Sequence, residues 1–213
     1  MDGAWVDKLE RRFGFLAAPG LPVFITGMTV LVGVLEVLKP EFADMLGLDP
    51  VALRHGEVWR VISFLFVPPP SGPQWLILMI LWILMLYSIL QALEHAWGDF
   101  KFTVFLLIGV LATAAGAVAT GAYFGNAFII LAAFLAFARL LPDREVLVMF
   151  ILPVKMRWLA GLAAVWLALE FFTNGLDTKV ELATGLLPYF LFFGEGHWRE
   201  LKQGWRRWRQ NRP

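Results

Sequence analysis

Apolar residues are gathered into long runs along this chain, and polar residues fall between the runs. A helix of about 20 apolar residues spans the hydrocarbon core of a bilayer, because it satisfies its backbone hydrogen bonds internally. The pattern therefore predicts an all-α polytopic membrane protein with one membrane domain over residues 21–194. Its six predicted transmembrane helices cover residues 21–38, 75–93, 102–122, 123–141, 158–173 and 180–194.

Two of the connections between these runs keep apolar residues of their own. The first loop, 39–74, is too long for a turn and is expected to fold back into the membrane interface. In the fourth connection the apolar stretch 146–152 is too short to cross, so it is expected at the membrane surface. Pro153 prevents that stretch from continuing as a helix into the next run.

The first 20 residues place Trp5, Leu9, Phe13 and Leu16 at spacings of four, four and three. Apolar side chains at this spacing share one face of a helix, and the basic residues point in other directions around it. Residues 1–20 are therefore predicted to form an interfacial amphipathic helix. The alternative is a frayed tail with incidental aromatic residues.

Residues 195–213 form a basic, tryptophan-rich tail. The predicted membrane-surface residues in it are Trp198, Trp205, Arg206, Arg207 and Trp208. Aromatic and basic side chains in one amphipathic stretch suit anionic lipid headgroups, although a docking tail for a partner protein would look the same. Gly204 is expected to interrupt this helix.

Composition excludes a soluble globular protein, because 59% of residues are apolar, only 16% are charged and the mean hydropathy is +0.69. The absence of cysteine removes disulfides and thiolate metal sites. No cofactor, metal or nucleic-acid partner is expected.

The placement of basic residues predicts the orientation. With six spans, 14 of the 18 Lys and Arg residues fall on the side of the two termini. Basic loops stay in the cytoplasm, so both termini are predicted to be cytoplasmic. The short tails, with no cleavable signal in sight, point to a bacterial inner membrane.

Three motifs occur in an order that resembles the rhomboid superfamily. Trp59-Arg60 lies in the long first loop, Leu93-Glu94 with Gly98 ends the second run, and Gly125-Asn126-Ala127 opens the fourth. The resemblance covers roughly residues 23–194 and implies a rhomboid-like helix bundle.

The catalytic parts of rhomboid proteases are missing from this resemblance. Ala127 stands where those enzymes carry the nucleophilic serine, and the last run contains no histidine. Trp75 and Met79 occupy the positions of the two residues that stabilise the oxyanion, and a thioether donates no hydrogen bond. The resemblance therefore implies a pseudoprotease rather than an enzyme. The chain's serines and histidines lie elsewhere, at Ser63, Ser71, Ser88, His55, His95 and His197.

Among non-proteolytic relatives, the chain is most similar to derlins. Derlins keep the Trp-Arg pair and carry Gly-Gln-Ala-Phe where this chain has Gly125-Asn126-Ala127-Phe128. They also carry a Gly-His pair in the last span, where this chain has Leu187-Pro188, and an ATPase-binding box that is not found here. A shared fold is therefore better supported than a shared partner.

The remaining candidate residues are structural or client-binding. Arg60 needs acceptors, for which Glu57 or backbone carbonyls are expected, and a loop clamp is favoured over direct client binding. Asn126 is expected either to tie the fourth helix to a neighbour or to face a lateral cavity. Gly121 and Gly125 allow close helix packing, and Pro188 frees a carbonyl for a kink or a partner.

The resemblance implies a protein that binds transmembrane clients, thins the bilayer and passes the clients to an ATP-driven AAA+ protease or ATPase. Membrane lipids are further expected partners, and self-association is left open. The alternatives are an intramembrane hydrolase with an unrecognised site and a small channel or transporter. The runs show only Glu36, Glu170 and Glu181, near their ends, as carboxylates for a transport pathway.

Overall fold

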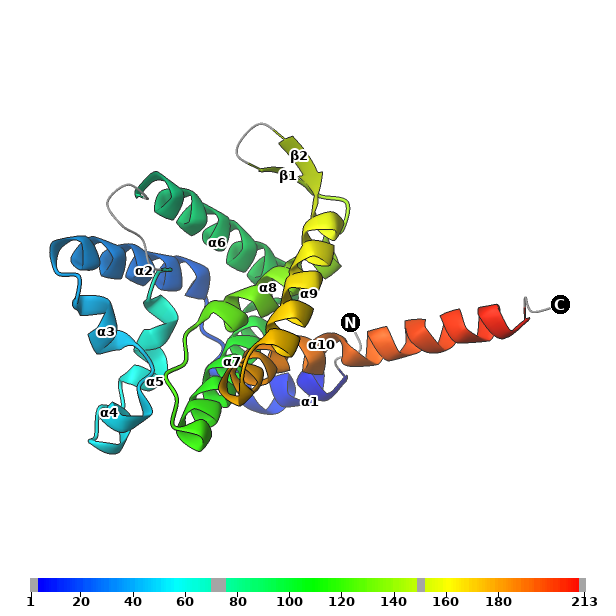
Figure 1. Cartoon of the computed structure of the whole chain (residues 1–213). Helices are drawn as coiled ribbons and strands as arrows, with labels where there is room; N and C mark the ends of the chain where they lie inside the picture. The colour runs from blue at the N-terminus through cyan, green and yellow to red at the C-terminus, as the bar shows by residue number, and fades with distance from the viewer. Residues whose placement is uncertain (1–3, 70–75, 149–151, 211–213) are drawn as a thin grey trace.

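The computed structural model describes residues 4–69, 76–148 and 152–210, which are predominantly helical (Figure 1). Among them, four helices are long and apolar enough to cross a membrane, as expected of an integral membrane protein. These are α2 (Leu21–Leu38), α6 (Leu76–Trp97), α7 (Asp99–Thr120) and α9 (Met156–Thr173). The bounds of α2 agree with the predicted run.

The fourth run forms a shorter helix than expected. Helix α8 (Ala127–Leu140) has 14 residues, because the chain before it is irregular instead of helical. Gly121 ends α7 with a φ of 74°, a left-handed conformation that glycine adopts without steric cost. The predicted helix start at Tyr123 is therefore wrong, and residues 121–126 connect α7 to α8.

The last run does not end at Gly194. Helix α10 (Leu176–Gln210) continues for 35 residues through Gly194 and Gly204, so the expected interruption at Gly204 is wrong. A glycine inside a helix costs only about 1 kcal/mol relative to alanine, which the flanking helix-forming residues can offset. The tail thus shares a helix with the bundle, and its C-terminal half extends away from the other helices (Figure 1).

The first loop is folded onto the bundle through four short helical segments. Of these, the segment Phe64–Phe66 is buried in all three side chains. The segments are α3 (Phe42–Leu46), α4 (Pro50–Arg54), α5 (Arg60–Ser63) and the 3-10 helix Phe64–Phe66. The fourth connection forms an antiparallel hairpin of β1 (Glu145–Val148) and β2 (Leu152–Lys155), with Glu145 opposite Lys155. Pro153 lies in β2, in agreement with its predicted effect on a helix.

Small residues hold α7, α8 and α10 together at the centre. A Cβ atom on Gly109 of α7 would lie 3.4 Å from Cγ of Pro188 in α10. One on Gly116 would lie 3.0 Å from a methyl of Thr184. A Cβ on Gly185 of α10 would lie only 2.5 Å from Cβ of Phe128 in α8. Close approach of the backbones is therefore built into this three-helix centre.

Helix α1 (Ala4–Phe13) docks on the bundle and is followed by a 3-10 turn, Gly14–Leu16. Val6 is fully buried, and the Trp5 ring meets Phe192 edge-on with centroids 5.7 Å apart. Phe13 and Leu16 remain exposed. Part of the predicted apolar face thus packs against the helix bundle, and the exposed remainder can contact the membrane interface.

Ion pairs fasten both terminal segments to the same end of the bundle. Nζ of Lys101 lies 2.6 Å from Oδ1 of Asp7, and this hydrogen bond lowers the pKa of Asp7 below its ordinary value. Arg139, at the end of α8, donates a hydrogen bond to Glu200, which lowers the pKa of Glu200. The N-terminal helix therefore contacts the start of α7, and the tail contacts the end of α8. These two helix ends lie at the same end of the bundle.

Candidate functional site

Arg60 is a buried clamp at the start of α5. Its Nε donates to Oε2 of Glu57 at 2.7 Å, and its Nη1 donates to the carbonyl oxygens of Asp44 and Gly47 at 2.8 and 2.9 Å. The guanidinium presents several donors in a fixed plane, so one side chain can join three points of the loop. Both predicted kinds of acceptor are confirmed, and neighbouring Trp59 is exposed beside the clamp.

The clamped loop is joined to the connection between α7 and α8. The Phe124 N–H donates to the Leu48 carbonyl oxygen at 3.3 Å in an isolated antiparallel bridge. The Tyr123 ring occupies the space that a side chain on Gly47 would need. The first loop and residues 121–126 therefore form one unit, at the end of the bundle where α7 stops and α8 begins.

A carboxylate from α10 fixes the next step of this connection. Oε1 of Glu181 accepts a hydrogen bond from the Gly125 N–H at 2.8 Å. This contact holds the backbone just before α8 begins. The apolar runs place Glu181 only near a helix end, because nothing in a linear sequence indicates a contact with Gly125.

Asn126 ties the start of α8 to the end of the first loop, and not to a neighbouring transmembrane helix. Its Nδ2 donates to the carbonyl oxygens of Leu65 and Val67 at 2.9 and 2.8 Å. Both N–H groups of the amide are used in this way. Within the described part of the chain, no hydrogen bond reaches Oδ1 of the same side chain.

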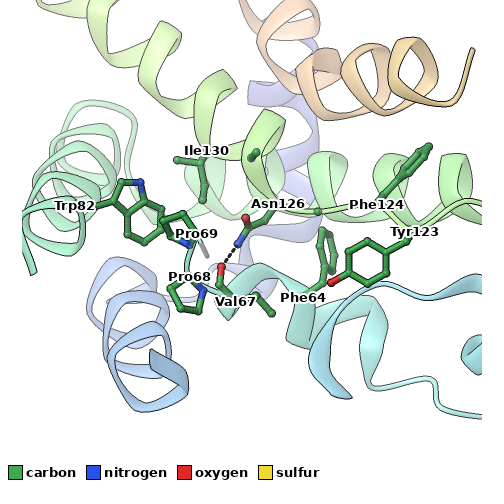
Figure 2. A pocket seen from close by; sticks show the side chains of 11 residues that line it. Phe64, Val67, Pro68, Pro69, Trp82, Tyr123, Phe124, Asn126 and Ile130 are labelled. Atoms are coloured by element: carbon green, nitrogen blue, oxygen red, sulfur yellow. Dashed lines mark hydrogen bonds between the residues drawn. The ribbon is translucent and has the colours of Figure 1, made fainter. Parts of the chain in front are cut away.

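Asn126 also faces a pocket of about 340 Å³, so both expectations for this residue are met in part (Figure 2). Trp82 of α6 and Ile130 of α8 form one wall, and Pro68 and Pro69 form another. Ala127, the first residue of α8, is exposed in it. The full lining is Phe64, Val67, Pro68, Pro69, Trp82, Tyr123, Phe124, Gly125, Asn126, Ala127 and Ile130.

The pocket is suited to binding an apolar group. Its walls are aromatic rings, prolines and aliphatic side chains, and Ala127 contributes only a methyl group. The lining residues with polar side-chain atoms are Trp82, Tyr123 and Asn126. Such a lining favours hydrocarbon contact with a few hydrogen bonds that fix orientation.

None of the described serines or histidines lines the pocket. Oγ of Ser63 donates to the Leu46 carbonyl oxygen and Oγ of Ser88 to that of Leu84. His95 contacts Gln91, and His197 lies 2.8 Å from the hydroxyl of Tyr189. His55 is an exposed residue of the first loop. Ser71 lies outside the described residues, as does Trp75.

Other predicted site residues lie away from the pocket. Glu94 is buried near the end of α6 that lies away from the pocket, and it accepts the Gly20 N–H at 3.0 Å. Gly98 directly precedes α7 as its N-cap, with a φ of 80°. Pro188 packs on Gly109 in the helix centre, and Met79 packs on Gly33. In the tail, Trp198 and Trp205 are exposed. The backbone of Arg206, Arg207 and Trp208 is helical, and their side chains lie outside the described part of the chain.

In comparisons with known proteins, the chain matches no family model and no curated protein sequence.

Proposed function

We propose that this protein is a non-proteolytic, derlin-like relative of the rhomboid superfamily that binds transmembrane clients. The observation that carries the proposal is the pocket at the start of α8, where Ala127 lines an apolar cavity. A methyl group cannot act as a nucleophile, so we expect such a pocket to bind a client and not to catalyse acyl transfer. A partner ATP-driven protease or ATPase would then degrade or extract the client.

The pocket's chemistry supports a protein client. An apolar side chain of a client would lie against Trp82, Ile130 and the two prolines. Oδ1 of Asn126 would accept a hydrogen bond from a polar group of the client, because both N–H groups of that amide already bind the loop. A hydrogen bond made in this apolar surrounding is worth about 1 kcal/mol.

The short fourth helix supports local thinning of the bilayer. Helix α8 has 14 residues, so at 1.5 Å per residue it is about 21 Å long, against a hydrocarbon thickness of about 30 Å. A bilayer thins around a short span or draws flanking polar groups inward. A thinner bilayer would lower the barrier for a weakly apolar client helix to tilt or leave.

The proposal includes six membrane crossings, with α8 and the first part of α10 added to the four long apolar helices. Asp7 and Glu200 contact the same end of the bundle, which supports placing both termini on one side of the membrane. The excess of basic residues on that side would make it the cytoplasmic side of a bacterial inner membrane. The exposed Trp198 and Trp205, with the basic residues around them, would then contact anionic lipid headgroups.

Site-specific photocrosslinking tests the proposed pocket. A photoreactive phenylalanine analogue at Ala127 or Ile130 should crosslink a transmembrane test client in membranes. The same analogue at Leu111, which is exposed on α7 outside the pocket, should give a weak background. Equal crosslinking at the three positions would overturn client binding in the pocket.

The client in these membranes should remain full length. Cleavage that disappears in Ser63→Ala, Ser71→Ala or Ser88→Ala protein would replace this proposal with an intramembrane hydrolase. Crosslinking and cleavage are read on the same sample, so a client that binds without being cut is distinguished from a substrate.

A further inference from the structure

The outward face of α6 carries one continuous stripe of side chains. Residues 77, 81, 84, 88, 91 and 95 follow one another at alternating steps of four and three, the spacing that forms a single helix seam. Ile77 and Leu84 are 72% and 56% exposed, and Ser88 and His95 are exposed as well. The buried side of α6 faces the other helices, so the seam points away from the bundle.

This seam changes from apolar to polar along the helix. Ile77 and Leu84 give way to Ser88, Gln91 and His95, although α6 is one of the helices apolar enough to cross a membrane. Nδ1 of His95 lies 2.8 Å from the carbonyl oxygen and 3.1 Å from Nε2 of Gln91. In the described part of the chain, no hydrogen bond reaches Oε1 of Gln91 or Nε2 of His95.

Gln91 lies within the apolar run 75–93, where lipid tails offer no partner to its Oε1, so another polar group is favoured at this face. We propose that the α6 seam is the contact between two copies of this chain. Copies inserted in the same direction place their α6 helices parallel, so each seam residue meets its own counterpart at the same depth. A carboxamide is both donor and acceptor, and Gln91 can therefore pair with Gln91 of a second copy.

The exposed face of α9 does not offer the same argument. Trp158, Leu162, Val165 and Leu169 also form an exposed stripe, but every member is apolar. Lipid covers an apolar stripe as well as a second helix does, because lipid tails are as apolar as leucine. The polar half of the α6 seam is what distinguishes the two faces. This inference is independent of the proposed function.

Cysteine crosslinking tests the seam directly, because the chain contains no cysteine. Full-length Leu84→Cys and Ser88→Cys proteins should form disulfide-linked dimers on mild oxidation in native membranes. Met85→Cys is the matched control: Met85 is 42% exposed but points about 100° around the helix from Leu84. Leu162→Cys controls for the α9 face. Both controls should give dimer yields about tenfold lower, as expected of residues off a helix seam.

A second substitution tests the polar contact. Gln91→Leu in the Leu84→Cys protein should lower the dimer yield about fivefold, the effect of one interhelical hydrogen bond. Gln91→Asn, which keeps an amide, should retain part of the yield. Equal yields at Leu84 and Met85, a higher yield at Leu162, or a yield unchanged by Gln91→Leu would each overturn the proposal.

Discussion

Helices α7 and α9 are both apolar enough to span a membrane, yet they are packed very differently. Over their most apolar windows, 56% of α7 is buried inside the protein and only 11% of α9. Gly109 and Gly116 bring α7 close to α10, whereas a Cβ on Gly161 of α9 would meet nothing within 4 Å. Hydropathy thus indicates which helices enter a membrane, while small residues that face one another decide which helices form the centre.

A bulky substitution at matched glycines should show the largest difference. Gly185→Leu should destabilise the protein by about 3 kcal/mol, because the new side chain collides with the Phe128 backbone and Cβ. Gly161→Leu should have little effect or stabilise α9, since the site is open. The free energy of unfolding in mixed micelles measures both. Similar losses at the two sites would mean that α9 is packed at Gly161 as closely as α10 is at Gly185.

A buried and an exposed arginine of the first loop should differ in their contribution to stability, as the two glycines do. Arg60→Leu should cost about 2 kcal/mol, because it leaves the carbonyls of Asp44 and Gly47 and the Glu57 carboxylate without their partner. Arg54→Leu, at an exposed arginine of the same loop, should be nearly neutral. Limited proteolysis of the first loop and the unfolding free energy report the two effects. An Arg60→Leu protein with a protease-resistant loop would contradict the clamp.

Asn126 and Asn174 form a matched pair at the ends of the central and outer helices. Asn126→Leu should cost about 1 kcal/mol, because two loop carbonyls lose their donors. Among the described residues, the Asn174 side chain at the end of α9 hydrogen-bonds to Glu170 and Thr173 of its own turn, so Asn174→Leu should change less. Hydrogen exchange near residues 64–67 should speed up in the first variant alone. No change there would show that Asn126 does not hold the loop.

The smallest effect is expected at the terminal ion pair. The pKa of Asp7 is lowered in the folded protein, so the pair stabilises α1 above the ordinary carboxylate pKa. That contribution is lost as the pH falls through the lowered pKa. Hydrogen exchange of α1 should therefore accelerate at acidic pH, and Asp7→Asn should remove that part of the pH dependence. The same acceleration in Asp7→Asn protein would assign it to another group.

Run lengths and helix-breaking residues made much of the fold predictable. The bounds of α2, the end of α9 and the non-helical stretch at Pro153 follow from apolar runs and from proline's missing N–H group. The start of α8 was missed, because Tyr123 and Phe124 are as apolar as the helix that follows. The backbone N–H of Phe124 instead binds Leu48 of the first loop, a contact that no local pattern reveals.

The candidate site was predictable in its residues and only partly in its contacts. The buried positive charge of Arg60 requires acceptors wherever it lies, so its carbonyl and carboxylate partners could be foreseen. Trp82, Pro68 and Glu181 could not, because they reach the site from different elements through tertiary packing. A distance of 56 residues separates Gly125 from the glutamate that binds it.

Helix α10 joins the close backbone contact at Gly185 to its exposed tail. Gly185 lies against Phe128 near one part of this helix, and Trp205 is exposed near its other end. With 35 residues at 1.5 Å each, the rod is about 52 Å long. Because one continuous helix connects them, a partner that pulls on the tail would exert force on the backbone contact at Gly185. Bending of the helix at Gly194 or Gly196 would reduce that force.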